Sequence, residues 1–276
     1  MNKVYIQNLG MIITNRCNLD CGHCMRGCKN NKDMSKEVVK QSLNQIKAIG
    51  NLAICGGEPT LAIDVLNDIF TYIVENKIIV EQVSMVINGT NYSSEFIRLL
   101  DYINEYVSYF SHFKKEKSTY FTISYDEYHK QELKRLDMVK QYLENVKKYS
   151  ESKYFSNFNI LSDKLKLFRE VNAESLDKSL TIDYKPMNIL VTYPGKNKML
   201  DKNGLCNIGP LMTVNVDGII TECDVSIKNQ EIIYNYGNVF DNSFEEVALS
   251  KGKILKPRKW YKECAKEIQK FKTYNN

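Results

Sequence analysis

Three cysteines near the N-terminus have the spacing of ligands to a metal cluster. Cys17, Cys21 and Cys24 form a C-x3-C-x2-C run. A [4Fe–4S] cluster normally takes four thiolates, one for each iron, so three ligands would leave one iron open to another molecule. An open coordination position is typical of reactive metal sites rather than structural ones. The spacing therefore predicts chemistry at a cluster.

Zinc is the alternative metal for this run. Short cysteine spacings beside a histidine also hold tetrahedral Zn²⁺, and His23 lies between Cys21 and Cys24. One backbone turn would then have to aim three neighbouring side chains at a single ion, and the usual two separated pairs of ligands are missing from the pattern. The spacing favours the iron–sulfur cluster over zinc.

A second motif follows about thirty residues later. Residues 52–55 are an apolar run that predicts a strand, and Gly56, Gly57, Glu58 and Pro59 come directly after it. Glycines let a backbone approach a ligand closely, and proline fixes a turn. The cysteine run followed by Gly-Gly-Glu-Pro closely resembles the radical S-adenosylmethionine (SAM) enzymes.

The resemblance implies a mechanism and a set of site residues. In that family SAM binds the open iron, and the Gly-Gly-Glu-Pro segment binds its methionine amino group. Cys17, Cys21 and Cys24 would hold the [4Fe–4S] cluster, and residues 56–59 would line the methionine end of SAM. One electron, from a donor such as flavodoxin or ferredoxin, would cleave SAM to a 5′-deoxyadenosyl radical that abstracts a substrate hydrogen.

Two further strand ends offer candidate SAM contacts. Asn88 ends a predicted strand, and its alternative role is an ordinary Asn-Gly turn. Ser124 and Asp126 end another strand and match positions that face SAM in family members, although Asp126 could equally cap the next helix. The segment 123–129 also resembles enzymes that modify ribosomally made peptides.

Strand and helix patterns alternate along most of the chain. Parallel sheets of this kind carry ligand sites at the C-terminal ends of their strands, where both motifs fall. The predicted class is α/β, and the resemblance implies a partial, open (βα)6 TIM-like barrel with a small C-terminal α+β extension. We expect strands over 4–14, 52–55, 83–87, 120–124, 155–161 and 180–193, and helices over 35–49, 61–76, 94–109, 131–149 and 164–176.

A polar, turn-rich stretch marks a domain boundary near residue 200. We expect a radical SAM core over 1–200 and an extension with a basic helical tail over 201–276. In the extension, Asp217-Gly218 between two alternating runs predicts a hairpin. This segment resembles the start of the SPASM or Twitch extensions of peptide-modifying members, which carry auxiliary iron–sulfur clusters.

The extension departs from that pattern because it lacks the further group of closely spaced cysteines. Cys206, Cys223 and Cys264 are the remaining candidates for a second iron–sulfur cluster. The alternatives are buried packing for these cysteines, or a role for Cys223 as the thiol that returns a hydrogen to a substrate radical. Cys28 and Cys55 are expected to pack near the cofactor.

Composition fits this interpretation. The 276-residue chain is 43% hydrophobic, enough for a sizeable core. Its eight cysteines do not follow a secretory signal, so a reducing cytoplasm is the expected compartment. No apolar run is long enough to span a membrane, and a net charge of +5 is too small to indicate nucleic acid.

Three functions therefore compete. The first is radical SAM modification of a peptide or protein, suggested by the hairpin and Cys223. The second is the same chemistry on a nucleoside, an RNA or a small metabolite, suggested by the compact core and the basic tail. The third is a non-catalytic iron–sulfur or zinc protein.

Overall fold

The structure is a computed structural model that describes residues 4–22, 24, 29–109, 119–151, 159–162, 211–221, 227–228, 231–232, 235–250 and 264. Within these residues the core is a seven-stranded sheet with the order β5-β4-β3-β2-β1-β6-β7, beside a two-stranded sheet of β8 and β9. The strands are β1 (Val4–Ile12), β2 (Ile46–Cys55), β3 (Ile79–Ile87), β4 (Thr119–Tyr125), β5 (Asn159–Ser162), β6 (Leu211–Val214), β7 (Ile220–Thr221), β8 (Ile227–Lys228) and β9 (Glu231–Ile232).

The main sheet is parallel and open. Strands β1 to β5 pair in chain order, each parallel to the next. Strand β6 adds to the free side of β1, also parallel, and β7 pairs antiparallel with β6. Strands β5 and β7 thus form opposite edges, and the sheet of described strands does not close. The predicted α/β class with an open sheet is confirmed.

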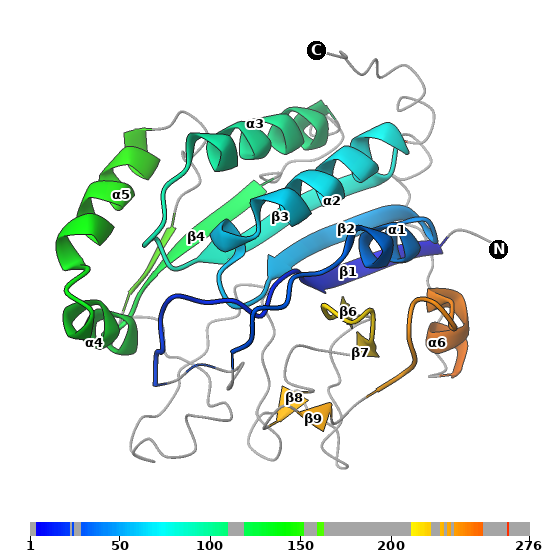
Figure 1. The fold of residues 1–276 in the computed structure, drawn as a ribbon. Coiled ribbons are helices and arrows are strands. Elements are labelled where there is room, and N and C mark those ends of the chain that lie inside the picture. The colour runs from blue at the N-terminus through cyan, green and yellow to red at the C-terminus, as the bar shows by residue number, and fades with distance from the viewer. Residues whose placement is uncertain are drawn as a thin grey trace.

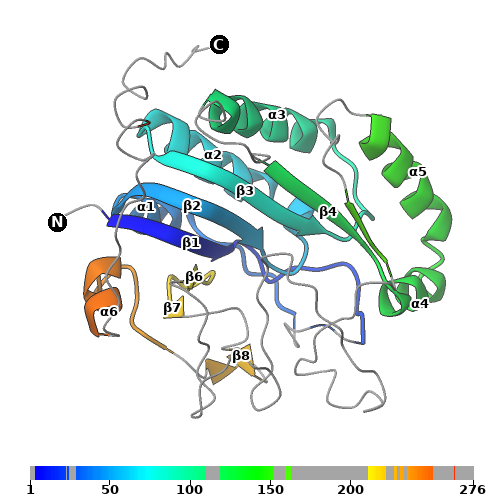
Figure 2. The ribbon, with the colours of Figure 1, turned by 180° about the vertical axis from the view of Figure 1, so that it is seen from behind.

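Helices cover one face of this sheet. Helices α1 (Lys36–Leu43), α2 (Ile63–Glu75) and α3 (Ser94–Tyr109) connect successive strands and lie side by side on that face (Figure 1). Figure 2 shows the strands of the opposite face in front of them. The remaining helices are α4 (Glu127–Arg135), α5 (Val139–Glu151), α6 (Phe244–Ser250) and a short 3-10 turn, η1 (Pro59–Leu61).

The apolar spacing of α2 explains how a helix attaches to the sheet. The apolar residues along one side of α2 are buried, and sheet residues such as Leu52 and Val83 have no exposed surface. Burying one such side chain stabilises the fold by about 1.5–3 kcal/mol. The buried face of α2 consists of Val65, Leu66, Ile69, Phe70, Ile73 and Val74.

The helix expected over 35–49 is shorter than predicted. Ser35 caps α1 as expected, accepting a hydrogen bond from the Val38 amide at 3.3 Å, but the helix ends at Leu43. Strand β2 begins at Ile46, which pairs with Val4. Apolar residues with helical spacing also fit a strand that is buried on both faces, so periodicity alone could not separate the two elements here.

The helix expected over 131–149 is two helices. Helix α4 begins at Glu127, because the side chain of Asp126 caps it. The helical conformation is interrupted at Asp137, whose φ of 54° lies in the left-handed region, and α5 follows. The predicted elements over 164–176 and 180–193 lie outside the described residues.

The predicted hairpin around Asp217-Gly218 is confirmed. Gly218 has a φ of 79°, which favours glycine. The side-chain oxygen of Asn215 accepts hydrogen bonds from the amides of Asp217 and Ile219, both at 2.9 Å. Because β6 of this hairpin pairs with β1, this part of the expected extension joins the main sheet.

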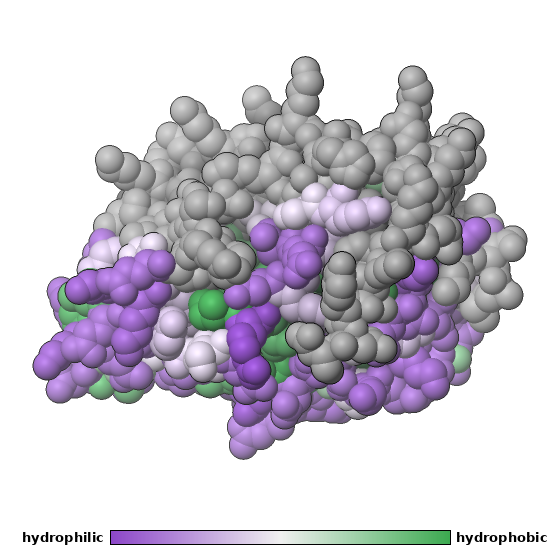
Figure 3. Space-filling view, turned by 90° about the horizontal axis from the view of Figure 1, so that it is seen from above, coloured by the Kyte–Doolittle hydropathy of each residue, from purple (hydrophilic) through white to green (hydrophobic). Residues whose placement is uncertain are grey.

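One face of the described surface is largely polar. Figure 3 shows hydrophilic residues over most of the described part of one face, with hydrophobic residues in small areas between them. Among the described residues, no helix combines the length and the apolar character that crossing a membrane requires.

Candidate functional site

The cysteine run lies on a loop that leaves the end of β1 and returns to its own start. The Asn15 amide donates to the carbonyl oxygen of Lys32 at 2.8 Å, and the Met34 amide donates to that of Ile13 at 2.8 Å. We call residues 14–33 the cysteine loop. These bonds close the loop at its base, so its shape does not depend on the cysteines alone.

Arg16, directly before Cys17, locks that base. Its guanidinium pairs with both carboxylate oxygens of Asp33, at 2.8 and 2.5 Å, and it also donates to the carbonyl oxygen of Leu61. The hydroxyl of Thr14 donates to the same carboxylate at 2.6 Å. A planar guanidinium matches a carboxylate in this two-pronged way, which fixes geometry as well as charge.

The Gly-Gly-Glu-Pro segment lies directly against the cysteine loop. The Gly57 amide donates to the Thr14 carbonyl oxygen at 2.8 Å, and the Glu58 amide donates to the Arg16 carbonyl oxygen at 2.7 Å. A Cβ atom on Gly57 would lie 2.1 Å from that Arg16 oxygen and 3.0 Å from the Cβ of Cys17. Only glycine allows the two backbones to come this close.

Glu58 is a buried carboxylate with hydrogen-bond donors on both oxygens. It is 1% exposed and accepts from the Thr60 amide at 3.0 Å, the Thr60 hydroxyl at 2.6 Å and the Asn88 amide at 2.6 Å. Burial raises the pKa of Glu58 to about 7, although these donors lower it in part. Pro59 is buried at the first position of η1. Glu58 thereby joins the ends of β2 and β3.

Asn88, at the end of β3, contacts the cysteine loop. Its side-chain nitrogen donates to Asn18 Oδ1 at 2.9 Å and lies 3.9 Å from Cys17 Sγ. Its side-chain oxygen accepts from the Thr90 amide and hydroxyl, at 2.9 and 2.7 Å. The Asn18 side chain in turn donates to the Thr90 hydroxyl at 2.7 Å. These hydrogen bonds connect the loop to the third strand.

A further anchor holds the loop to α4. The Asp20 amide donates to the buried Glu132 carboxylate at 2.8 Å, and Arg135 pairs with the same carboxylate at 2.7 and 2.8 Å. Lys29 donates to the Leu19 carbonyl oxygen and lies 3.1 Å from the carboxylate of Asp20. The stretch between the first two cysteines is therefore held from both sides.

The three thiols share one partly buried environment. Burial raises the pKa of Cys17 to about 11, opposed in part by the Leu19 amide and by the charge of Lys29. The pKa of Cys21 is raised by burial first and then by the charges of Asp126, Cys17 and Cys24. The Cys24 amide donates to the Cys21 carbonyl oxygen at 2.9 Å. A thiolate in this environment needs positive charge nearby, which metal binding provides.

The donor set is compatible with an iron–sulfur cluster. Among the described residues, no three cysteine, histidine or carboxylate side chains converge on a single ion position. Ligands of a [4Fe–4S] cluster bind different irons, so their sulfurs need not converge on one point. The described cysteines 17, 21, 24, 55 and 264 form no disulfide with one another.

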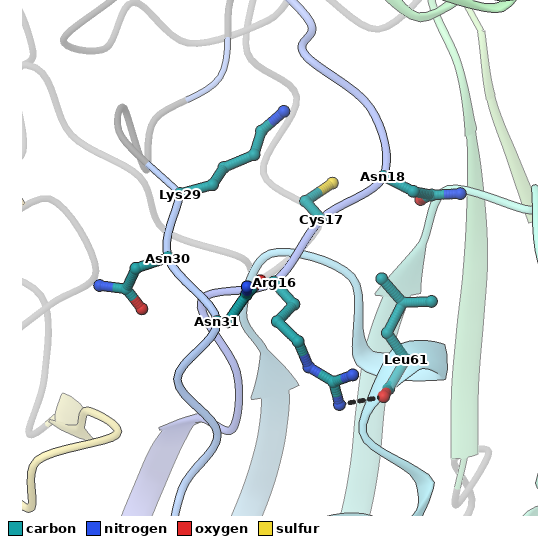
Figure 4. A pocket seen from close by; sticks show the side chains of 7 residues that line it. All are labelled: Arg16, Cys17, Asn18, Lys29, Asn30, Asn31 and Leu61. Atoms are coloured by element: carbon teal, nitrogen blue, oxygen red, sulfur yellow. Dashed lines mark hydrogen bonds between the residues drawn. The ribbon is translucent and has the colours of Figure 1, made fainter.

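A pocket of about 300 Å³ opens beside Cys17. Figure 4 shows Lys29 and Cys17 at this pocket, with Arg16 turned away toward Leu61. Its described lining is basic and rich in amides, and none of the lining residues that the structure describes is a carboxylate, which favours an anionic or strongly polar group beside the loop. The lining residues are Arg16, Cys17, Asn18, Lys29, Asn30, Asn31 and Leu61.

The other predicted site residues have mixed surroundings. Asp126 is 3% exposed and caps α4 by accepting from the His129 amide at 3.0 Å, so it fills the helix-cap role that the sequence left open. Ser124 accepts at its carbonyl oxygen from the Tyr142 hydroxyl at 3.0 Å. Cys264 is fully buried. Cys206 and Cys223 lie outside the described residues, as do His23 and Cys28.

Sequence reasoning missed the polar residues that hold the cysteine loop. Asn18 and Arg16 each flank Cys17, so their positions in the sequence were the signal that could have found them. Asp33, Lys29 and Glu132 have no such signal, because their partners are set by folding.

The chain matches a family model and a curated protein. A family model described as the Radical SAM superfamily matches residues 11–180, more than half of the chain. An uncharacterized protein of Methanocaldococcus jannaschii is 34% identical over 74 residues, which cover 26% of this chain and 26% of that protein. The chain thus matches about a quarter of the length of this curated relative.

Two solved structures are similar at low identity. Native anSMEcpe with bound AdoMet has a TM-score of 0.49 and 17% identity, covering 94% of this chain and 88% of that one. The structure of Streptococcus suis SuiB has a TM-score of 0.38 and 16% identity, covering 89% of this chain and 65% of that one.

Proposed function

Because this chain belongs to the radical SAM superfamily, we propose that it binds a [4Fe–4S] cluster and SAM on the cysteine loop and the Gly-Gly-Glu-Pro segment. One observation carries the proposal: two backbone hydrogen bonds, Gly57 to Thr14 and Glu58 to Arg16, join the segment to the loop. Two motifs about thirty residues apart in sequence thereby form one site.

In this proposal each motif has a distinct task. Cys17, Cys21 and Cys24 hold the cluster, and the backbone of Gly56 and Gly57 approaches the methionine end of SAM. When bound, the cluster supplies one electron that cleaves SAM to methionine and a 5′-deoxyadenosyl radical, which abstracts a substrate hydrogen. The chain itself fixes the thiols and keeps this region partly buried from water.

Other residues are proposed around that centre. Glu58 and Pro59 shape the segment from within, since both are buried. Ser124 and Asp126 remain proposed SAM contacts at the end of β4, and Asn88 at the end of β3. Asp126 also caps α4, which fixes the position of its carboxylate. An electron donor such as flavodoxin or ferredoxin is the proposed partner.

A peptide or protein is the proposed substrate. The support is the hairpin of β6 and β7, with Gly237-Asn238-Val239 packed on it, which resembles the start of a SPASM or Twitch extension. The Val239 amide donates to the Gly218 carbonyl oxygen at 2.9 Å. We propose a core over 1–200, an extension over 201–276, and a cytoplasmic location. A second cluster at Cys206, Cys223 and Cys264, or hydrogen return by Cys223, belongs to the same proposal.

Anaerobic reconstitution tests the central claim. The full chain should take up about four irons with the sulfide of one cubane, and with dithionite it should convert SAM to 5′-deoxyadenosine. About eight irons would support the second cluster. Binding of zinc alone, or iron without SAM cleavage, would support the non-catalytic alternative and contradict the proposal.

A second experiment addresses the substrate. Coexpression with short peptides encoded beside the gene should give a product of changed mass. Nucleosides, RNA and small-metabolite pools form the comparison arm. Substrate-dependent 5′-deoxyadenosine with those pools, and none with peptides, would favour the second function.

A further inference from the structure

The side-chain amide of Asn88 has one possible orientation. The Thr90 backbone amide lies 2.9 Å from the side-chain oxygen of Asn88, and a backbone N–H can only donate. The atom that faces Thr90 must therefore be the oxygen. The NH₂ group then faces Asn18 and Cys17, so its direction follows from hydrogen bonding rather than from a choice between two similar atoms.

A closed ring of hydrogen bonds strengthens this assignment. Asn88 donates to Asn18, Asn18 donates to the Thr90 hydroxyl, and that hydroxyl donates back to Asn88. Every donor meets an acceptor in this one direction only. The Asn88 backbone amide is held separately by Glu58 at 2.6 Å. Asn88 is 8% exposed, so the ring lies largely away from competing water.

The nitrogen of this NH₂ group also lies near a thiol. Asn88 Nδ2 lies 3.9 Å from Cys17 Sγ, near the upper limit for a hydrogen bond to sulfur, and it also donates to Asn18. A thiolate accepts such a bond more strongly than a thiol, because it carries the negative charge. The Asn88 side-chain nitrogen thus has two protein partners, Asn18 and Cys17.

We propose that Asn88 is a positioning residue that donates an N–H···S hydrogen bond to the Cys17 thiolate and raises the reduction potential of the cluster. The inference rests on the proposed function. Reduction adds negative charge to a cluster and its sulfur ligands, and a fixed donor beside one sulfur stabilises the reduced form more than the oxidised form. The ring with Asn18 and Thr90 keeps that donor in place.

The test compares three variants of the full, reconstituted chain. Asn88→Asp replaces the NH₂ group by an oxygen of nearly the same size, and Asn88→Ser removes it. Asn91→Asp is the matched control, because Asn91 lies three residues later and donates to the Thr60 carbonyl oxygen at 3.0 Å. Iron and sulfide are assayed first, and a potentiometric titration followed by EPR then gives the midpoint of each protein.

Both Asn88 variants should have lower midpoints than wild type, with Asn88→Asp the lower of the two. At the wild-type midpoint potential, the ratio of reduced to oxidised cluster should fall at least threefold in Asn88→Ser. This corresponds to a midpoint lowered by about 30 mV, because a tenfold change in ratio equals 59 mV for a one-electron couple. The midpoint of Asn91→Asp should differ from the wild-type midpoint by less than half that shift.

Unchanged midpoints in iron-loaded Asn88 variants would overturn the inference, and so would an equal shift in Asn91→Asp. Loss of iron from both Asn88 variants would also overturn it, because the residue would then act on loop shape alone. The proposed function fails separately, if wild type itself takes up no cluster or does not cleave SAM.

Discussion

The backbone amide of Glu58 donates to the carbonyl oxygen of Arg16 at 2.7 Å, which fixes the residue that precedes Cys17. The Arg16 side chain returns across the same junction to the carbonyl oxygen of Leu61. The cysteine loop and the Gly-Gly-Glu-Pro segment therefore hold each other in position. A substitution in either of them should therefore disturb the position of the other.

Gly57→Ala should destabilise the protein by about 1–3 kcal/mol, because the new Cβ would lie 2.1 Å from a backbone oxygen. Without that clash the substitution would stabilise slightly, by about 0.4–1 kcal/mol through the unfolded state. Chemical denaturation measures the sign. Gly22→Ala is the matched control, because among the described residues its Cβ would meet only Tyr128, at 3.9 Å. Equal effects of the two substitutions would contradict the close approach.

Arg16→Met should cost about 1–2 kcal/mol of unfolding free energy and lower the iron content after reconstitution. The guanidinium and the Asp33 carboxylate are each about one-third exposed, at 35% and 32%, so solvent weakens the pair but does not cancel it. Lys36→Met removes the exposed pair with Asp68 and should change stability by less than about 0.5 kcal/mol. If both variants behave alike, Arg16 has no special role in the loop.

Stability should depend on pH through Glu58. Its pKa in the folded protein is about 7, above its ordinary value of 4.5. The folded state thus holds this proton more tightly than the unfolded state. The stabilisation is complete below pH 4.5 and is lost as the pH rises to about 7, up to about 3 kcal/mol in all.

Unfolding of the apoprotein at a series of pH values checks this expectation. Glu58→Gln removes the titration, although its NH₂ group would face hydrogen-bond donors and weaken the fold at every pH. The difference in free energy of unfolding between wild type and Glu58→Gln should therefore become smaller as the pH rises from 4.5 to 7. A difference that stays constant over this range would rule out a raised pKa at Glu58.

Replacing any one of Cys17, Cys21 and Cys24 by alanine should abolish cluster binding and reduce SAM cleavage to the background without enzyme. Three thiolates are the fewest that leave a single open iron, so none is dispensable. Cys55→Ala is the control, since Cys55 donates to the Met11 carbonyl oxygen at 3.5 Å as a packed strand residue. Iron analysis after anaerobic reconstitution gives the readout, and full iron in a loop variant would remove that cysteine from the ligand set.

Local patterns in the sequence predicted most elements but misplaced some of their ends. Helix α3 begins and ends where its spacing indicated, at Ser94 and Tyr109. The spacing around Ile46 predicts a helix because its apolar residues satisfy both periods, whereas pairing with β1 makes the segment a strand. The interruption between α4 and α5 at Asp137 likewise has no local sequence signal as strong as the apolar spacing that predicts one continuous helix.

The sequence by itself determined the chemical nature of the site, because ligand type and spacing are local: three thiols within eight residues, and a Gly-Gly-Glu-Pro segment at a strand end. Only the tertiary structure decided which residues support them. Neighbouring parallel strands bring their C-terminal ends to one edge of the sheet. That arrangement sets Arg16 beside Glu58, and it sets Cys17 beside Asn88 of a strand whose place in the sheet no local pattern specifies.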